Sequence, residues 1–117
     1  MQRYRALIGI VVMGCATGGQ TVFRAPTSDT IESGSEMNYG GDGYTIYVRN
    51  ESSVPINVTG LQLYDCENIK SECGPGMPLK VRVDPGRRQN IFIVRIENTT
   101  RASHFRFHYS WEQAAAR

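Results

Sequence analysis

The chain has 117 residues, which is room for one domain. It carries 13 basic residues, 11 acidic residues and three cysteines. Its net charge of +2 falls to zero when Arg3 and Arg5 at the extreme N-terminus are set aside. This balance argues against electrostatic nucleic-acid binding, which requires a concentrated basic face.

The first residues have the pattern of an export signal. Arg3 and Arg5 precede the apolar run Ala6–Met13, and the small residue Gly14 stands before Cys15. A basic start, a short apolar core and a small residue at the cut are typical of a secretory signal peptide. The apolar run of about eight residues is far below the roughly 20 that span a bilayer as a helix.

The segment Val12-Met13-Gly14-Cys15 resembles the lipobox of bacterial lipoproteins. The resemblance implies that residues 1–14 are a signal peptide, and that Cys15 carries a diacylglycerol, and often a further acyl chain such as palmitate. The protein would then be held by lipid on a membrane of the bacterial cell envelope. Two alternatives stay open: a soluble secreted protein cut near Ala16 or Gly18, and a cytosolic protein with Leu7–Met13 as a buried strand.

The other two cysteines, Cys66 and Cys73, form a pair if Cys15 is lipidated. Disulfides persist in exported proteins, and a bond here would close a loop of about eight residues. In the chain-entropy account such a bond is worth about 2–3 kcal/mol. Six residues lie between them, unlike the two to four of a zinc knuckle. The alternative is two free thiols in a flexible loop.

Residues 15–42 are predicted to be the lipidated cysteine and a flexible polar tether. After Cys15 the segment is rich in Gly, Ser, Thr and acidic residues, and its apolar residues follow no period of two or 3.6. Such a stretch buries too little surface to offset its ordering entropy. Its root-mean-square reach is about 25–30 Å. Thr21-Val22-Phe23 is a candidate for a short additional edge strand.

Residues 43–112 are predicted to form an all-β domain, followed by a frayed tail over residues 113–117. Alternating apolar positions and turn residues divide the domain into strands. Gly60 separates two inward pairs of opposite parity, which indicates a bulge. Asp84-Pro85-Gly86-Arg87 has the pattern of a type II turn. The five expected strands are 44–49, 56–64, 79–83, 89–96 and 104–111.

This strand pattern favours a small antiparallel β-sandwich. Its layout over residues 44–111 resembles immunoglobulin-like domains of bacterial surface proteins, and Leu61-Gln62-Leu63-Tyr64-Asp65 is similar to a strand ending of the FxLYD family. The resemblance implies adhesion, assembly or partner binding and no cofactor. It supports a fold more than a function, because this sandwich hosts many unrelated roles.

No motif for catalysis is present in the sequence. It contains no Gly-x-Ser-x-Gly, no cysteine in a recognisable nucleophile context and no phosphate-binding glycine loop. His104 and His108 would lie roughly 13 Å apart on one strand face, too far for one metal ion to bridge. We therefore expect a protein that is not an enzyme and holds no metal. A periplasmic metal-binding protein that uses Met77, His104 and His108 is an alternative, and Met77 with Cys66 and Cys73 is a separate candidate for a soft copper site, which competes with the disulfide.

The expected role is a non-catalytic binding or structural module that contacts an envelope protein. An accessory subunit or inhibitor of an envelope enzyme complex is a further alternative. Partner contact is predicted at an edge strand or at the Cys66–Cys73 loop. A second candidate surface is a set of four cations expected to point outward, which would meet an acidic partner or lipid headgroups if they shared one sheet. These cations are Lys80, Arg82, Arg95 and Arg106.

Overall fold

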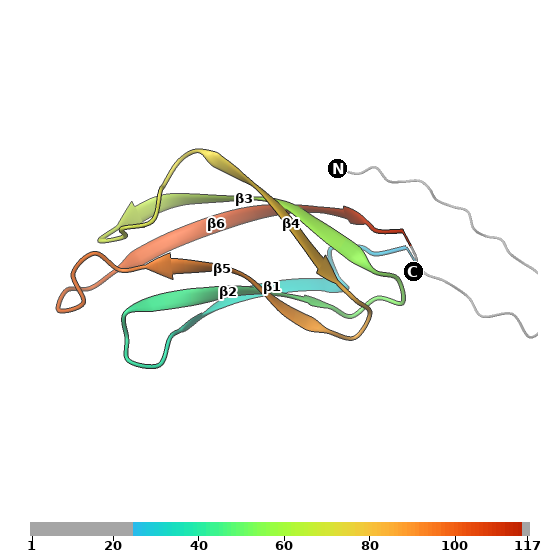
Figure 1. Ribbon diagram of the computed structural model, residues 1–117, viewed down its shortest axis with the longest axis horizontal. Helices are drawn as coiled ribbons and strands as arrows, with labels where there is room; N and C mark the ends of the chain where they lie inside the picture. The colour runs from blue at the N-terminus through green and yellow to red at the C-terminus, as the bar shows by residue number, and fades with distance from the viewer. Residues whose placement is uncertain (1–24, 116–117) are drawn as a thin grey trace, which may run out of the picture.

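The computed structural model describes residues 25–115 (Figure 1). The predicted signal peptide, Cys15 and the candidate strand Thr21-Val22-Phe23 lie outside the described residues. The described part forms six strands and no helix. The strands are β1 (Ile31–Met37), β2 (Gly43–Asn50), β3 (Ile56–Glu67), β4 (Gly76–Val83), β5 (Arg88–Arg95) and β6 (His104–Gln113).

The strands form two three-stranded sheets packed face to face. One sheet has the order β1-β2-β5 and the other has the order β4-β3-β6 (Figure 1). All hydrogen-bonded neighbours run antiparallel. The prediction of a small all-β antiparallel sandwich is therefore confirmed.

The core lies between the two sheets and follows the alternation of the strands. Ile46 and Val48 of β2 are fully buried, and they face buried residues of β3 such as Ile56 and Leu63. The aromatic side chains of β6 pack against this core, as the alternation predicted. These are Phe105, Phe107, Tyr109 and Trp111.

The predicted bulge at Gly60 is confirmed. The pairing of β3 shifts register between Val58 and Gly60 against both β4 and β6. Against β6 the shift leaves Thr59 as an extra residue on β3, so the inward pair Ile56 and Val58 is followed by an inward pair of opposite parity, Leu61 and Leu63. All four side chains enter one core.

A second bulge, which the sequence did not indicate, lies between β2 and β5. The register shifts so that Ile46 pairs with Phe92 while Tyr47 pairs with Asn90. Ile91 is the extra residue, and its side chain is buried together with the expected inward residue Val94. The bulge thus adds one apolar side chain to the core.

The two sheets are also joined where β1 approaches β6. Tyr109 makes a side-chain hydrogen bond with Ser33 of β1. Burial raises the pKa of Tyr109 above its ordinary value, and the Ser33 hydrogen bond opposes part of that shift. The ring of Tyr44 meets Phe105 edge-on at 5.1 Å between centroids. Tyr109 thus links β6 to β1, and the Tyr44–Phe105 contact links β6 to β2.

Several predicted boundaries were wrong, and β3 and β6 run past their expected ends to Glu67 and Gln113. Strand β1 lies inside the segment expected to be tether, so the folded domain begins before residue 43. Strand β4 begins at Gly76, three residues before the expected start at Leu79. The expected frayed tail is ordered as far as it is described: Ala114 is buried, and its N–H donates to the Pro55 carbonyl at 2.9 Å.

The turn at Asp84–Arg87 has the predicted type II geometry. Gly86 has φ of 74°, and the Arg87 N–H donates to the Asp84 carbonyl at 3.1 Å. The Gly86 N–H also donates to the Asn50 carbonyl at 2.7 Å. This turn joins β4 of one sheet to β5 of the other and is held against β2.

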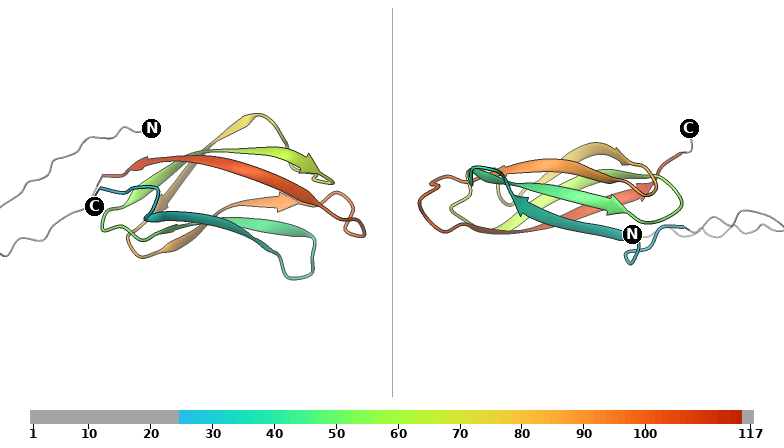
Figure 2. Two further views of the ribbon diagram at one scale, coloured as in Figure 1. Left: turned by 180° about the vertical axis from the view of Figure 1, so that it is seen from behind. Right: turned by 90° about the horizontal axis from the view of Figure 1, so that it is seen from below.

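The sandwich has two different ends. The first and last described segments of the chain lie at one end, which we call the proximal end (Figures 1 and 2). Three connections gather at the opposite end, which we call the distal end. They are the β1–β2 hairpin at 38–42, the disulfide loop at 68–75 and the β5–β6 loop at 96–103.

Candidate functional site

The four predicted cations do not share one sheet. Lys80 and Arg82 on β4 and Arg106 on β6 belong to one sheet, whereas Arg95 on β5 belongs to the other. Arg82 is engaged: its Nε lies 2.8 Å from Asp84 Oδ1, and its Nη1 donates to the Ala115 carbonyl at 2.9 Å. Arg82 therefore braces the proximal end, and Arg95 must be considered separately.

The two histidines have different neighbours. His104 Nε2 lies 3.3 Å from Asp65 Oδ2. The His108 ring stacks on Tyr64 with 4.2 Å between centroids. Both side chains are exposed on the outer face of their sheet, as the alternation of β6 predicted. Each histidine has its own contact, and nothing in their arrangement joins them to one site.

The cysteine pair is bonded. The Cys66–Cys73 disulfide has an S–S distance of 2.07 Å, so it offers no thiolate to a soft metal ion. Met77 lies on β4 opposite Leu61. Within residues 25–115, no group of three or more His, Cys, Asp and Glu side chains is arranged to hold a metal ion. In the same range, no helix is long and apolar enough to cross a membrane.

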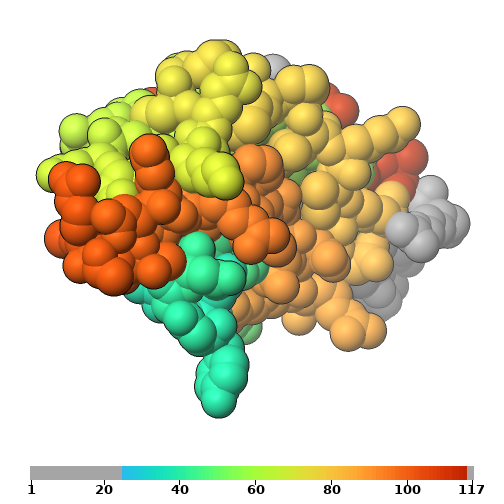
Figure 3. Space-filling model, turned by 60° about the vertical axis from the view of Figure 1, so that its left-hand side comes forward, coloured from blue at the N-terminus to red at the C-terminus, as the bar shows by residue number. Residues whose placement is uncertain are grey.

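The most exposed aromatic side chain of the described residues lies at the distal end. Tyr39 is fully exposed at the tip of the β1–β2 hairpin, which projects from the body of the molecule (Figure 3). The Gly41 N–H donates to the Asn38 carbonyl at 2.9 Å, and Gly40 has φ of 96°, as at the third position of a type II turn. Tyr39 occupies the outer corner of that turn.

Asn38 holds this hairpin tip in place. Its N–H donates to the Gly43 carbonyl at 2.8 Å, and its side-chain oxygen accepts a hydrogen bond from the Thr45 hydroxyl. Asparagine commonly stabilises turns through such side-chain contacts. The exposed ring of Tyr39 is therefore presented on an ordered turn.

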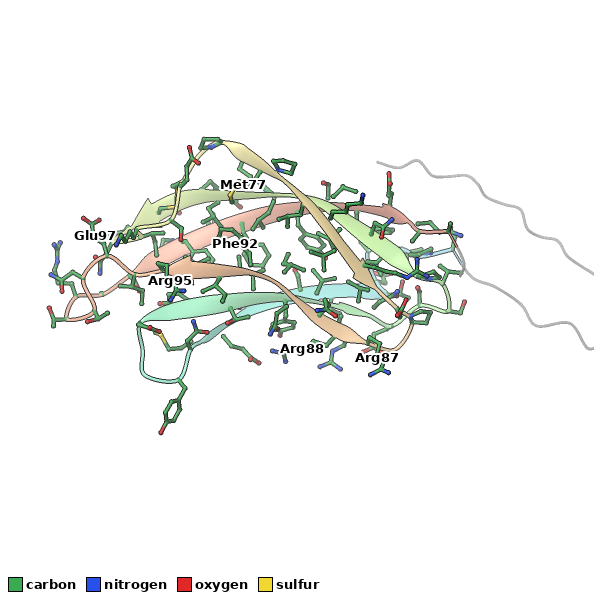
Figure 4. The ribbon with its side chains drawn as sticks, viewed as in Figure 1. Met77, Arg87, Arg88, Phe92, Arg95 and Glu97 are labelled. Carbon is green, nitrogen blue, oxygen red and sulfur yellow. A yellow bond between two sulfur atoms is a disulfide. The ribbon has the colours of Figure 1, made fainter. Side chains whose placement is uncertain are left out.

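A shallow surface pocket of about 390 Å³ lies beside this hairpin. It is formed where the ends of β2 and β5 meet the disulfide loop and the β5–β6 loop. Arg95 points toward this end of the molecule in Figure 4, whereas Arg87 and Arg88 lie toward the proximal end. The pocket is lined by Asp42, Lys70, Ser71, Arg95, Ile96 and Thr99.

Backbone contacts between three segments build the pocket walls. The Ile96 N–H donates to the Asp42 carbonyl at 3.2 Å, and the Lys70 N–H donates to the Arg95 carbonyl at 2.8 Å. The Arg95 N–H in turn donates to the Ser71 hydroxyl at 2.9 Å. The last residues of β5 therefore hold the hairpin on one side and the disulfide loop on the other.

Asn68 ties the disulfide loop to the β5–β6 loop. Its Oδ1 accepts a hydrogen bond from the Asn98 N–H at 2.9 Å, and its Nδ2 donates to the Asn98 carbonyl at 2.8 Å. The carbonyls of Arg101 and Ala102 lie 3.1 and 3.2 Å from the same nitrogen. One side chain thus connects both loops that border the pocket.

The charged side chains that line the pocket make only weak ion pairs with other groups of the protein. Arg95 Nη1 and Asp42 Oδ2 are 3.9 Å apart, and both side chains are 59% exposed, so solvent screens this pair strongly. Among the described residues, Lys70 makes no side-chain ion pair. Two cationic groups in one shallow site are therefore available to a ligand.

Comparisons with known protein families, with curated proteins and with solved structures found no match to this chain.

Of the residues at the distal end, the sequence indicated Arg95 and the Cys66–Cys73 loop as candidate contact surfaces, but it did not indicate the hairpin or the pocket. Asn38-Tyr39-Gly40-Gly41 is a turn signature, which we interpreted as part of the tether. The roles of Asn68, Lys70 and Thr99 depend on contacts between separate loops, and no local pattern indicates them.

Proposed function

We propose that this chain is a lipid-anchored, non-catalytic binding or structural module of the bacterial envelope. The lipobox-like segment ending at Cys15 supports the anchor. The observation that supports the binding role is the difference between the two ends of the domain. The chain enters and leaves at the proximal end, while Tyr39 and the pocket lie at the distal end.

The distance from the proposed anchor to the domain supports this orientation. Ten peptide steps separate Cys15 from Ala25, a path of at most about 35 Å. The tether is therefore shorter than the sequence suggested, because β1 takes up part of it. A short tether attached at the proximal end leaves the distal end as the part of the domain that projects farthest from the membrane.

The chemistry of the exposed groups also favours binding over catalysis. Among residues 25–115, the pKa values of Glu36, Arg88 and Tyr109 are shifted, and each of these side chains has a structural partner. None of them lines the distal pocket. In contrast, an exposed tyrosine on an ordered turn has the features of an interface anchor, since it brings a large contact area at a low cost in conformational entropy.

Metabolic labelling with palmitate tests the anchor. The full-length protein should incorporate label and fractionate with membranes, and the Cys15→Ala variant should lose both properties. Label retained in Cys15→Ala would overturn the proposed anchor.

Site-specific photo-crosslinking in the intact envelope tests the binding end. A photoreactive phenylalanine analogue is placed at Tyr39, and the matched control carries it at Arg87, an exposed residue of the proximal end. Adducts with another envelope protein should form from position 39 and be scarce from position 87. Adducts from position 87 alone would contradict a distal interface.

The projecting hairpin also favours a second candidate, an exported inhibitor or accessory subunit of an enzyme complex. A tyrosine at the apex of an ordered turn has a shape that enters a cleft on a partner. The same crosslinking experiment separates the two roles. If the adduct from position 39 is an enzyme and its activity changes when the variant Tyr39→Ala replaces the wild type, the inhibitor or subunit role is correct.

A further inference from the structure

The distal pocket has a specific charge arrangement. Lys70 and Arg95 come from different segments, the disulfide loop and β5, and both line the pocket together with the hydroxyl-bearing residues Ser71 and Thr99. The side chain of Ile96 is buried and contributes the apolar part of the lining. Two cations and two hydroxyl groups around an apolar patch match the hydrogen-bonding pattern of a carboxylate.

Building on the proposed function, we propose that this pocket binds a single carboxylate of an acidic side chain in a protein partner, with Lys70 and Arg95 as the binding cations. The guanidinium of Arg95 presents paired donors that fit the two carboxylate oxygens, and Lys70 adds a second positive charge. Tyr39, three residues before the pocket residue Asp42, contacts the neighbouring apolar surface of the same partner.

The surroundings of the pocket favour one carboxylate over a polyanion. Asp42 lines the pocket itself, Glu72 follows Ser71, and Glu97 follows Ile96 at the distal end (Figure 4). These acidic groups repel a ligand with many closely spaced negative charges, such as a nucleic acid or a strongly anionic lipid surface. A single carboxylate meets less of this repulsion than a polyanion does, and inside the pocket it faces two cations, Lys70 and Arg95, against the one acidic group Asp42.

The pocket is ordered before a ligand arrives. The Arg95 backbone donates to Ser71 and accepts from Lys70, so both cationic residues belong to one hydrogen-bonded unit. The disulfide between Cys66 and Cys73 closes the loop that carries Lys70 and Ser71. A preorganised site loses little conformational freedom on binding, which favours the recognition of a single side chain.

NMR titration of the oxidised protein tests the proposal directly. The probe is a blocked tetrapeptide, acetyl-Gly-Glu-Phe-Gly-amide, and its matched control contains Gln in place of Glu. The Glu peptide should shift the amide signals of Lys70, Ser71, Arg95 and Thr99 in a saturable manner. The Gln peptide should bind about tenfold more weakly, because the charge-assisted hydrogen bonds are lost. Equal binding of the two peptides would overturn the proposal.

Substitutions identify the binding groups. Lys70→Gln and Arg95→Gln should each weaken binding of the Glu peptide by about fivefold to tenfold, as expected for one charge-assisted contact. Arg87→Gln, which removes an equal charge at the proximal end, should leave binding unchanged. A dispersed amide spectrum checks that each variant is folded. If the binding constants of Lys70→Gln and Arg95→Gln equal that of the wild type, the pocket is not the site.

Titrations with acetate and with inorganic phosphate test whether the pocket recognises a carboxylate within a peptide, a free carboxylate or a phosphate. Acetate should bind much more weakly than the Glu peptide, because it lacks the peptide contacts. Acetate that binds as tightly would show a site for free carboxylates and overturn the role of a protein segment. Inorganic phosphate that binds more tightly than the Glu peptide would overturn the carboxylate assignment.

The failure of this proposal and of the proposed function are distinguishable. If crosslinks from position 39 persist in the Lys70→Gln and Arg95→Gln background and no peptide binds, the distal interface stands and the carboxylate site is wrong. If the peptide binds in vitro and position 39 gives no crosslink in the envelope, the carboxylate site stands and the proposed distal interface is wrong.

Discussion

The ring of Tyr47 on β2 lies across the backbone of Gly34 on β1. An ideal Cβ built on Gly34 would lie 2.5 Å from Tyr47 Oη and 2.8 Å from its Cζ, closer than carbon atoms approach in real structures. The guanidinium carbon of Arg88 lies 3.7 Å from the centroid of the same ring. Arg88 also bonds Glu36 of β1 at 2.6 Å, so it reaches across the sheet and holds the ring in place.

Gly34→Ala should therefore destabilise the domain by about 1–2 kcal/mol, because the added methyl group displaces a ring that Arg88 holds. Chemical denaturation of the oxidised protein measures this change. In a Tyr47→Ala background the obstacle is gone, and the same substitution should be neutral or slightly stabilising, since alanine reduces the freedom of the unfolded chain. An equal loss in both backgrounds would show that Tyr47 is not the cause.

The Glu36–Arg88 pair should show itself in the acid titration of Glu36. The hydrogen bond from Arg88, assisted by its charge, lowers the pKa of Glu36 below the ordinary glutamate value. A carboxyl group whose pKa is lowered on folding stabilises the fold above its unfolded pKa of about 4.3, and this contribution is lost as pH falls through the lowered value.

Carbon-detected NMR titration of the Glu36 carboxyl measures this effect. In Arg88→Gln the pKa of Glu36 should rise toward the ordinary value, and in the matched control Arg87→Gln it should keep the value of the wild type. High salt should shift it in the same direction as Arg88→Gln, because both groups are exposed to solvent. A titration midpoint that does not respond to Arg88→Gln would contradict the assignment.

Most of the core was predictable because local residue order specifies it. The alternation of β2, β3 and β6 separates inward from outward side chains, and Gly60 marks the point where that alternation changes parity. The turn at Asp84–Arg87 depends on the intrinsic preferences of Pro85 and Gly86. Each of these features is decided within a few residues of the sequence.

Strand β1 was not predictable for the opposite reason. Of its seven residues only Ile31 is buried, and Glu32, Ser35 and Glu36 are exposed, so no alternation marks it. Its structure depends on pairing along the whole of β2. The distal pocket was missed for the same kind of reason, because loops distant in sequence form it. The parity of Arg95 predicted exposure correctly, but which sheet it joins depends on topology.

Asn50 should be among the most sensitive polar positions. Its side chain is fully buried, and its Nδ2 donates to the carbonyls of Val54 at 2.7 Å and Val83 at 3.0 Å. Its Oδ1 accepts from the N–H and the hydroxyl of Ser52. Asn50→Ala removes these four buried hydrogen bonds, while the Ser52 hydroxyl still donates to the Val54 carbonyl at 2.9 Å. We expect a loss of about 2–4 kcal/mol in the free energy of unfolding.

Asn50→Asp makes that loss dependent on pH. The aspartate keeps the acceptor to Ser52 but removes both donors, and burial beside two carbonyls raises its pKa in the folded state. A raised pKa on folding means that stability falls as pH rises from the unfolded aspartate value of about 3.9 through the folded value. Urea denaturation at pH 4 and pH 7 should give a smaller difference from the wild type at pH 4. No difference between the two pH values would contradict a buried carboxyl group.

Asn68 connects the disulfide loop to the β5–β6 loop through its side-chain amide, and its backbone has a positive φ. Two substitutions separate the contribution of the amide from that of the backbone conformation. Asn68 has φ of 60°, which glycine adopts without strain and alanine does not. Asn68→Gly therefore removes the amide alone and should destabilise the domain by about 1–2 kcal/mol through the lost bonds to Asn98. Asn68→Ala should lose about 1 kcal/mol more, because it adds the strain of a positive φ.

Hydrogen exchange identifies which part of the domain Asn68→Gly destabilises. In Asn68→Gly the amide of Asn98 loses its acceptor and should exchange faster, and so should Lys70, whose N–H belongs to the adjoining pocket wall. The amide of Ala114 at the proximal end should keep its rate, because Pro55 still accepts its hydrogen bond. Uniform acceleration at both ends would indicate global destabilisation, and it would mean that Asn68 does not act locally on the two loops that form the pocket.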